Sequence, residues 1–287
     1  MSDLGTILTA IVTPFADDGS LDEDAFVALH QHVVRLGSDG VVACGTTGEA
    51  STLADDEHLR VVELAVTEKP EGTTVIAGTG SNDTAHAVHM TERATELGVD
   101  AILSVTPYYN KPPRRGLVAH YREIAKATDK PIVLYNIPQR SAIDVPNDLL
   151  AELAQIDGIE AVKQANHANL APIDGLRIYG GNDDMLADVL DMGEAGGILT
   201  SSHIVGDRMK AMVDASPEER RRIEDELRPL YDALTRPQPA IALKAALELI
   251  GVRAGRPRLP YVELDHAERV ELREALERHG LLEPARS

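Results

Sequence analysis

The chain has 287 residues, of which 43% are hydrophobic and only 3% aromatic, so we expect an aliphatic core in one large domain, or in one domain with a small appendage. Acidic residues (47) outnumber basic ones (28), and the formal net charge of -19 excludes nucleic-acid binding over most of the surface. A single cysteine excludes an internal disulfide, and no apolar run approaches the roughly 20 residues of a membrane span, so a cytoplasmic protein with no membrane partner is expected.

Short apolar runs rich in β-branched residues alternate along the chain with segments whose apolar residues recur at helical spacing. Because the runs are apolar on both faces and alternate with helical patterns, they favour parallel strands in an α/β fold, the (β/α)8 TIM barrel, over a doubly wound open sheet. Eight strands are predicted, at Ile7–Thr13, Gly40–Cys44, Thr74–Gly78, Ala101–Thr106, Pro131–Asn136, Ile159–Lys163, Leu176–Tyr179 and Gly197–Thr200.

Helices are predicted between the strands, several of them beginning at Asp or Asn and ending at Gly. They include Asp22–Leu36, Asp55–Glu68, Asp83–Leu97, Arg114–Ala127, Pro146–Gln155 and Asp183–Met192. After Ser216 the strand patterns cease, and three more helices are predicted at Pro217–Leu234, Pro239–Ile250 and Asp265–His279. We therefore expect a catalytic barrel over residues 1–226 and a C-terminal helical domain over 227–287, packed against the barrel because no long Ser/Gly linker precedes it.

Functional residues of such a barrel lie where the strands lead into the following loops. The unusual strand ends are GTTGE (45–49), PYYNKPP (107–113), YNIPQR (135–140) and EAVKQA (160–165), which holds Lys163. Burial among apolar neighbours disfavours an ammonium group, so the pKa of Lys163 is expected to fall, and a neutral amine can form a Schiff base with a carbonyl. The alternative is a lysine at a strand end whose charged head reaches water.

Two further side chains bear on this lysine. Tyr135 lies about one strand from Lys163 and offers a phenol that can exchange a proton with a forming carbinolamine; alternatively, it covers the end of the core with its hydroxyl in solvent. Lys244 is the other lysine in apolar surroundings, but its segment has a helical period outside the barrel. A structural role with a solvated charge is therefore expected for Lys244.

Groups suited to a carboxylate occur at two strand ends. In GTTGE, small residues let backbone N–H groups approach a ligand, and Thr46 and Thr47 add hydroxyls that suit a carboxylate or a phosphate. The alternative is an ordinary turn in which Gly45 and Gly48 have positive φ and the threonine hydroxyls bond the local backbone. Arg140 is either a solvated surface arginine or a cation that grips a carboxylate through two parallel hydrogen bonds.

No metal site is expected, because the histidine pairs His30/His32 and His86/His89 lie in helical segments away from the strand ends, and spacing of two residues points the first pair to different faces. The glycine spacing of dinucleotide-binding or P-loop proteins does not occur in the sequence. Cys44 is interpreted as a small core residue rather than a nucleophile.

Taken in order, TAIVTPF (9–15), GTTGE, PYYNKPP, YNIPQR, AVKQA, GGNDD (180–184) and RPRLPYVEL (256–264) span almost the whole chain. These motifs resemble those of the pyruvate-dependent class I aldolases in the dihydrodipicolinate synthase and N-acetylneuraminate lyase family. The resemblance implies a carbon–carbon lyase on a TIM barrel, a homotetramer, and no cofactor beyond a covalent imine between lysine and pyruvate.

The same resemblance implies roles for individual residues. Lys163 would form the Schiff base with pyruvate, whose carboxylate would be bound by Thr46 and Thr47. Thr47 and Tyr135 would share a proton relay with Tyr109, which in this family reaches into the site of the neighbouring subunit.

The resemblance also bears on the substrates. Gly181 and the backbone carbonyl of Ile198 match positions that line the pyruvate pocket. Arg140, after YNIP, matches the arginine with which synthases bind the carboxylate of aspartate semialdehyde, so condensation of pyruvate with this aldehyde in lysine (diaminopimelate) biosynthesis is implied. The alternatives are a related aldolase that cleaves 2-keto-3-deoxy sugar acids or N-acetylneuraminate, and, more remotely, a non-enzymatic regulator that binds a keto acid.

One departure from the family concerns regulation. Lysine-inhibited members bind lysine at a subunit interface near positions matching Asp55, His58, Asn82, His86 and Tyr108. Here His86 stands where a glutamate is expected. Because the amine of lysine loses a counter-charge, weak or absent lysine feedback is predicted.

Overall fold

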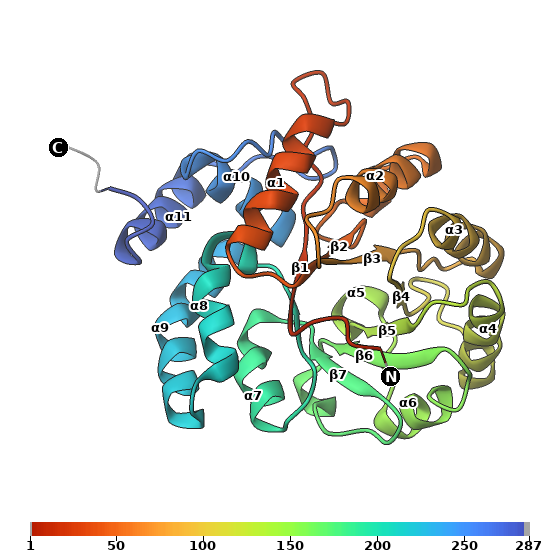
Figure 1. Cartoon of the computed structure of the whole chain (residues 1–287). Helices are drawn as coiled ribbons and strands as arrows, with labels where there is room; N and C mark the ends of the chain where they lie inside the picture. The colour runs from red at the N-terminus through yellow and green to blue at the C-terminus, as the bar shows by residue number, and fades with distance from the viewer. Residues whose placement is uncertain (1, 284–287) are drawn as a thin grey trace.

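Figure 1 shows the computed structural model, which describes residues 2–283 as eight parallel strands surrounded by helices. The sheet is closed, because β1 pairs with both β2 and β8. The predicted (β/α)8 barrel is thus confirmed, and the open sheet is excluded. The strands are β1 (Ile7–Ala10), β2 (Gly40–Ala43), β3 (Thr74–Gly78), β4 (Ala101–Val105), β5 (Ile132–Asn136), β6 (Ile159–Gln164), β7 (Arg177–Gly180) and β8 (Gly196–Leu199).

The helices that follow the strands form the outer layer. The α-helices are α1 (Glu23–Arg35), α2 (Asp55–Thr67), α3 (Thr84–Glu96), α4 (Arg114–Lys126), α5 (Pro138–Ser141), α6 (Asn147–Leu153), α7 (Leu186–Asp191), α8 (Ser202–Asp214), α9 (Pro217–Thr235), α10 (Pro239–Leu249) and α11 (His266–Arg278). Short 3-10 helices are η1 (Ala50–Thr52), η2 (His167–Asn169) and η3 (Asp183–Met185).

The predicted start and stop residues act as expected in several helices. Asp22 and Asp83 accept hydrogen bonds from the first turns of α1 and α3, and Gly37 follows α1 at a φ of 103°, which a residue with a side chain rarely adopts. Two helices were not among the predicted ranges. The short α5 begins at Pro138, and α8 contains Gly206, a poor helix former, beside Val205, whose φ/ψ pair is not helical.

Side chains alternate along the strands between two apolar clusters. On β3, for example, Ile76 belongs to the smaller cluster, whereas its neighbours Val75 and Ala77 belong to the larger one. Because successive side chains of a strand point to opposite faces, the smaller cluster fills the inside of the barrel and the larger one lies between strands and helices. On β6, Ala161 faces inward and Val162 outward, so Lys163 faces inward at the end of the strand.

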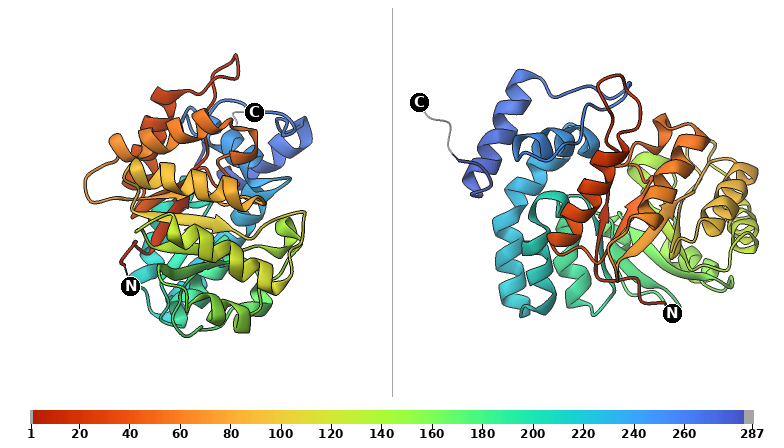
Figure 2. Two further views of the ribbon diagram at one scale, coloured as in Figure 1. Left: turned by 90° about the vertical axis from the view of Figure 1, so that its right-hand side faces the viewer. Right: turned by 45° about the horizontal axis from the view of Figure 1, so that its top comes forward.

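The three last helices lie together along one side of the barrel (Figure 2). α9 packs against α7, α8, α10 and α11, and α10 also contacts α8, so this segment packs against the barrel as expected. The division expected between residues 226 and 227 falls inside α9, and the separation into two domains stays a prediction. Within residues 2–283, no helix combines the length and apolar character that crossing a membrane requires.

Candidate active site

Strand register brings the predicted lysine and tyrosine side by side. Tyr135 and Lys163 are partners across β5 and β6, and both face the barrel interior. The Lys163 Nζ lies 4.5 Å from the centroid of the Tyr135 ring. Lys163 is only 4% exposed, so the alternative in which its head reaches bulk water is wrong.

Burial sets the protonation of both groups. Desolvation lowers the pKa of Lys163 to about 7, with a further lowering by Arg140 that is opposed by the negative charge of Asp183. Desolvation raises the pKa of Tyr135 to about 12. Near neutral pH the site therefore combines an amine that is partly neutral with a phenol that keeps its proton, which is the pairing that nucleophilic attack and proton donation need.

A cavity of about 440 Å³ gives access to this pair. It is bounded by strand-end residues and, unexpectedly from the sequence, by residues of α9. Its lining includes Thr46, Thr47, Tyr135, Arg140, Lys163, His167, Gly181, Asp183, Thr200, Arg228, Tyr231 and Asp232. The barrel end and the C-terminal helices thus form one site.

The turn after β2 presents both predicted threonines to the cavity. Neither the Thr46 nor the Thr47 hydroxyl forms a hydrogen bond with another described residue. Positive φ occurs at Cys44 and Glu49, not at Gly45 and Gly48, so the ordinary-turn alternative is wrong in both respects. The two hydroxyls are free to bind a ligand.

Arg140 is held at the rim by α5. This helix begins at Pro138, and the single Ser141 hydroxyl proton is shared between the Ile137 carbonyl oxygen at 3.0 Å and the Ile143 carbonyl oxygen at 2.9 Å. Arg140 is exposed and takes part in no ion pair among the described residues. A guanidinium without a carboxylate partner, facing the same cavity as a reactive amine, can bind the carboxylate of a substrate.

Gly181 lines the cavity where β7 ends. A Cβ atom at this position would lie 2.8 Å from the Ala165 Cβ, so only glycine fits without a shift of the neighbouring backbone. The Ile198 side chain is buried inside the barrel and does not line the cavity; the role expected for its backbone carbonyl stays a prediction.

Asp183 is a site residue that the sequence reasoning missed. Its buried carboxylate accepts hydrogen bonds from the N–H and hydroxyl of Thr200 and from those of Ser201, and it lines the cavity. These bonds fix the chain after β8 beside Lys163. Its place at the end of a strand, in GGNDD, was the available signal.

Tyr109 does not reach the cavity of its own chain. It is 88% exposed and has a φ of 72°, on the loop between β4 and α4. Its expected reach into a neighbouring subunit stays a prediction.

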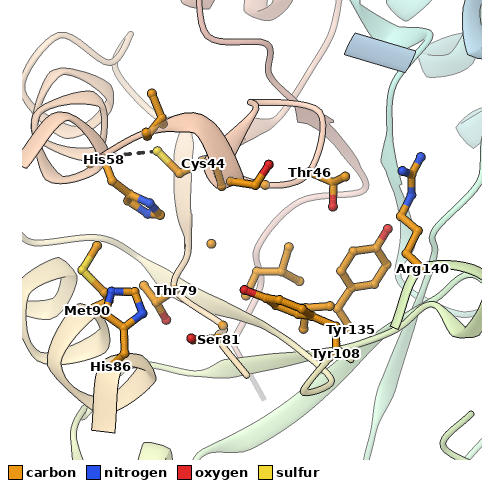
Figure 3. A pocket seen from close by; sticks show the side chains of 18 of the residues that line it. Cys44, Thr46, His58, Thr79, Ser81, His86, Met90, Tyr108, Tyr135 and Arg140 are labelled. Carbon is orange, nitrogen blue, oxygen red and sulfur yellow. Dashed lines mark hydrogen bonds between the residues drawn. The ribbon is translucent and has the colours of Figure 1, made fainter. Parts of the chain in front are cut away.

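A second cavity, of about 560 Å³, opens beside the first and shares Thr46, Tyr135, Ile137 and Arg140 with it. Figure 3 shows Tyr135 and Arg140 on one side of it and His58 and His86 on the other. Asp55 also lines it, and its carboxylate lies 3.0 Å from the His86 Nε2. Of the residues expected at a lysine site, Tyr108 lines this cavity too, whereas Asn82 does not.

Cys44 lies in the wall of the second cavity. It is buried, and desolvation raises the pKa of its thiol. A thiol that resists ionisation is a poor nucleophile, which agrees with a core role.

Lys244 proved different from the expectation. Its ammonium is not solvated: Lys244 is 1% exposed and its Nζ lies 2.6 Å from Oε1 of the buried Glu49. Desolvation lowers the pKa of Lys244 to about 8, but it does not line the cavity of Lys163. Within residues 2–283, no three His, Cys, Asp or Glu side chains gather as metal ligands would.

Comparisons with known proteins show which family the chain resembles over nearly its whole length. The sequence model of the dihydrodipicolinate synthetase family matches residues 3–279. Relatives named 4-hydroxy-tetrahydrodipicolinate synthase include one from Thermosynechococcus vestitus, 40% identical over 299 residues (98% of this chain, 99% of the relative), and one from Synechococcus sp. WH7803, 42% identical over 284 residues (95% and 94%).

Solved structures of the same family have a similar fold. The dihydrodipicolinate synthase of Acinetobacter baumannii, in complex with pyruvate, is 33% identical with a TM-score of 0.92, covering 97% of this chain and 100% of that one. The enzyme of Cyanidioschyzon merolae with lysine bound is 34% identical with a TM-score of 0.91, covering 98% and 100%. The chain belongs to the dihydrodipicolinate synthetase family.

Proposed function

We propose that this chain is a lyase that condenses pyruvate with aspartate semialdehyde to 4-hydroxy-tetrahydrodipicolinate, through a Schiff base on Lys163 and without a further cofactor. The observation that carries the proposal is the buried Lys163 amine, whose pKa is about 7, above the Tyr135 ring in a cavity with free threonine hydroxyls. The names of the relatives and the complex of one of them with pyruvate support it.

In the first half of the reaction, the pyruvate carboxylate accepts hydrogen bonds from Thr46 and Thr47, and the neutral Lys163 amine attacks the keto carbon. Tyr135 donates a proton to the carbinolamine oxygen, which leaves as water and gives the imine. A pKa of about 12 keeps that proton on Tyr135 until the oxygen becomes basic. The Tyr135 phenolate then takes up a proton from the methyl group, which converts the imine to an enamine and restores the phenol.

In the second half, the enamine carbon attacks the aldehyde of aspartate semialdehyde, whose carboxylate is held by Arg140. Tyr135 donates its proton to the new alkoxide, which becomes the hydroxyl, and recovers a proton from the substrate nitrogen when the ring closes. The amine of the substrate then adds to the imine carbon and displaces the Lys163 amine, which closes the ring and frees the enzyme. One water is released overall, from the carbinolamine.

The assembly and cellular setting are part of the same proposal. A homotetramer would let Tyr109 of one subunit complete the relay of Thr47 and Tyr135 in another, and its exposure on a loop supports this. One solved relative is described as a monomeric variant, so the oligomeric state must be measured. A cytoplasmic location fits the biosynthetic role.

The proposed function is tested by reduction with borohydride in the presence of pyruvate, followed by peptide mass mapping. We expect a pyruvyl adduct on Lys163 and none on Lys244. If no lysine carries an adduct, every Schiff-base reaction is excluded. Assays with aspartate semialdehyde, 2-keto-3-deoxy sugar acids and N-acetylneuraminate then identify the aldehyde; turnover of a sugar acid alone would overturn the assignment of the substrate.

Tyr135→Phe is expected to lower kcat by about 10²-fold, because the phenol proton is lost while the ring beside Lys163 is kept. Steady-state kinetics with both substrates measure this effect. Tyr179→Phe, in which the lost hydroxyl donates to Gly5 at the opposite end of the barrel, is the matched control. Equal kcat values for Tyr135→Phe and the unaltered enzyme would remove Tyr135 from the relay.

L-lysine is expected to bind weakly or not at all in the second cavity, because His86 stands in place of a carboxylate and its Nε2 already contacts Asp55. Calorimetric titration of L-lysine measures the affinity. His86→Glu should strengthen binding by roughly tenfold, since an opposite charge is added near the amine. Tight, inhibitory binding to the unaltered enzyme would contradict the prediction.

A further inference from the structure

A buried ion pair joins the turn after β2 to the C-terminal helices. Glu49, at the end of GTTGE, is 0% exposed, and Lys244 of α10 is 1% exposed, with 2.6 Å between Oε1 and Nζ. Both residues lie outside the cavity of Lys163. Removing two charges from water is costly, and such a pair is often no more stabilising than apolar side chains of the same size. Its presence beside this turn therefore calls for a role other than stability.

The remaining contacts fix both charges in place. Glu49 accepts a hydrogen bond at Oε2 from the Arg258 backbone N–H, at 2.9 Å. Lys244 donates to the Arg256 carbonyl group at 3.2 Å, and its Nζ lies 4.2 Å from the centroid of the Phe15 ring. The Arg258 guanidinium lies 4.1 Å from that same centroid. The Glu49 side chain thus cannot move without breaking contacts to α10 and to the loop after it.

The backbone of Glu49 is coupled directly to the threonines. Its N–H donates to the Thr46 carbonyl group at 3.1 Å, and its φ of 56° is one that residues with side chains rarely adopt unless their surroundings enforce it. On the other side of the turn, the Thr13 hydroxyl donates to the Gly48 carbonyl group at 2.7 Å. A displacement of Glu49 therefore moves the hydroxyls of Thr46 and Thr47.

We propose that Glu49 and Lys244 are positioning residues, whose ion pair holds the 45–49 turn so that Thr46 and Thr47 meet the carboxylate of pyruvate. The inference rests on the proposed function for the identity of that carboxylate. It gives α10, outside the barrel, a part in binding the first substrate.

The test compares Glu49→Gln, Lys244→Met and the double variant with Arg256→Met, in which an exposed arginine of the same C-terminal loop loses its pairing with the exposed Glu263. Each single variant leaves one buried charge unpaired and is expected to melt at a lower temperature. The double variant removes both charges and is expected to melt within about 5 °C of the unaltered protein. Arg256→Met is expected to behave as the unaltered protein in every assay, because both members of its ion pair are exposed.

The double variant distinguishes a positioning role of the ion pair from a purely structural one. If the pair positions the turn, KM for pyruvate rises by about tenfold, KM for aspartate semialdehyde changes by less than about twofold, and amide hydrogen exchange over residues 44–53 becomes faster. If KM for pyruvate and the exchange rates equal those of Arg256→Met, the proposal is overturned. Should the double variant fail to fold, Glu49→Asp, which keeps the charge but shortens its reach, is expected to raise KM for pyruvate by about threefold, and no rise overturns the proposal.

The exchange measurement separates this proposal from the proposed function. If the unaltered protein forms no pyruvyl adduct, the proposed function fails. Faster exchange over 44–53 in the double variant would still support a turn held by the ion pair, and unaltered exchange would still overturn it.

Discussion

Lys163→Met is expected to abolish the condensation and, at the same time, to stabilise the fold. The amine beside Tyr135 is the group that would form the Schiff base, so its loss should lower kcat by on the order of 10⁴-fold or more. Methionine fills a similar volume without a charge. The cost of burying an ammonium group inside the barrel disappears, and the free energy of unfolding rises.

The pH dependence of this stabilisation follows from the pKa of Lys163, which is about 7 in the folded chain against an ordinary value of 10.5. Between these values the unfolded chain holds the proton and the folded chain does not, so stability rises with pH across this range. The penalty is complete below pH 7 and absent above pH 10.5. At pH 6 to 7 we expect Lys163→Met to be more stable by on the order of 3 kcal/mol.

Chemical denaturation at pH 6, 8 and 10 measures the difference between the two proteins, which should shrink as the pH rises. Lys126→Met, which removes an exposed lysine of α4, is the control and should change neither stability nor turnover appreciably. A Lys163→Met variant that is less stable than the unaltered protein at pH 6 would show that the amine is not held in a desolvated site. Full turnover by Lys163→Met would contradict the proposed function.

Arg140→Ala is expected to lower kcat/KM for aspartate semialdehyde by on the order of 10²- to 10³-fold, because a bidentate charged contact to the second carboxylate is lost. Formation of the pyruvate imine should persist. Because the positive charge of Arg140 lowers the pKa of Lys163, its removal should move the pH profile of imine formation to slightly higher pH. Borohydride trapping over a pH series measures this shift.

Arg122→Ala removes an exposed arginine of α4 that lines neither cavity, and it is the matched control. Arg140→Lys keeps the charge but loses the planar fork, so an intermediate loss is expected. If Arg140→Ala turns over the semialdehyde as well as the unaltered enzyme does, the assignment of aspartate semialdehyde as the second substrate loses its main support. The assays with sugar acids then decide which aldehyde is used.

The fold was largely predictable from the sequence because a parallel barrel has a strong local signal. Each strand is buried on both faces and reads as a short apolar run, and β3 was predicted to the residue. α8 was missed because Gly206, a poor helix former, interrupts its sequence pattern. α5 was missed because the single turn from Pro138 is too short for periodicity to reveal.

The sequence predicted those site residues whose chemical role follows from their place at the end of a strand. Lys163 and Tyr135 are strand-end residues with unusual side chains, and strand register made them neighbours. The pairing of Glu49 with Lys244 was not predictable, because it depends on how α10 packs against a turn from the opposite part of the chain. The contribution of Tyr231 to the cavity was also not predictable, because α9 is far in sequence from most of the strand ends that it meets there.

Because α9 forms part of the cavity wall, the reactive amine and the entrance for the aldehyde lie on different parts of the chain. The strand ends carry the amine, whose environment tolerates few replacements, whereas Arg228 and Asp232 of α9 line the same cavity and are exposed. Replacement of these two exposed residues can reshape the entrance for an incoming aldehyde while the imine chemistry is preserved. Selectivity for new aldehydes can thus be sought by randomising Arg228 and Asp232 rather than the strand ends.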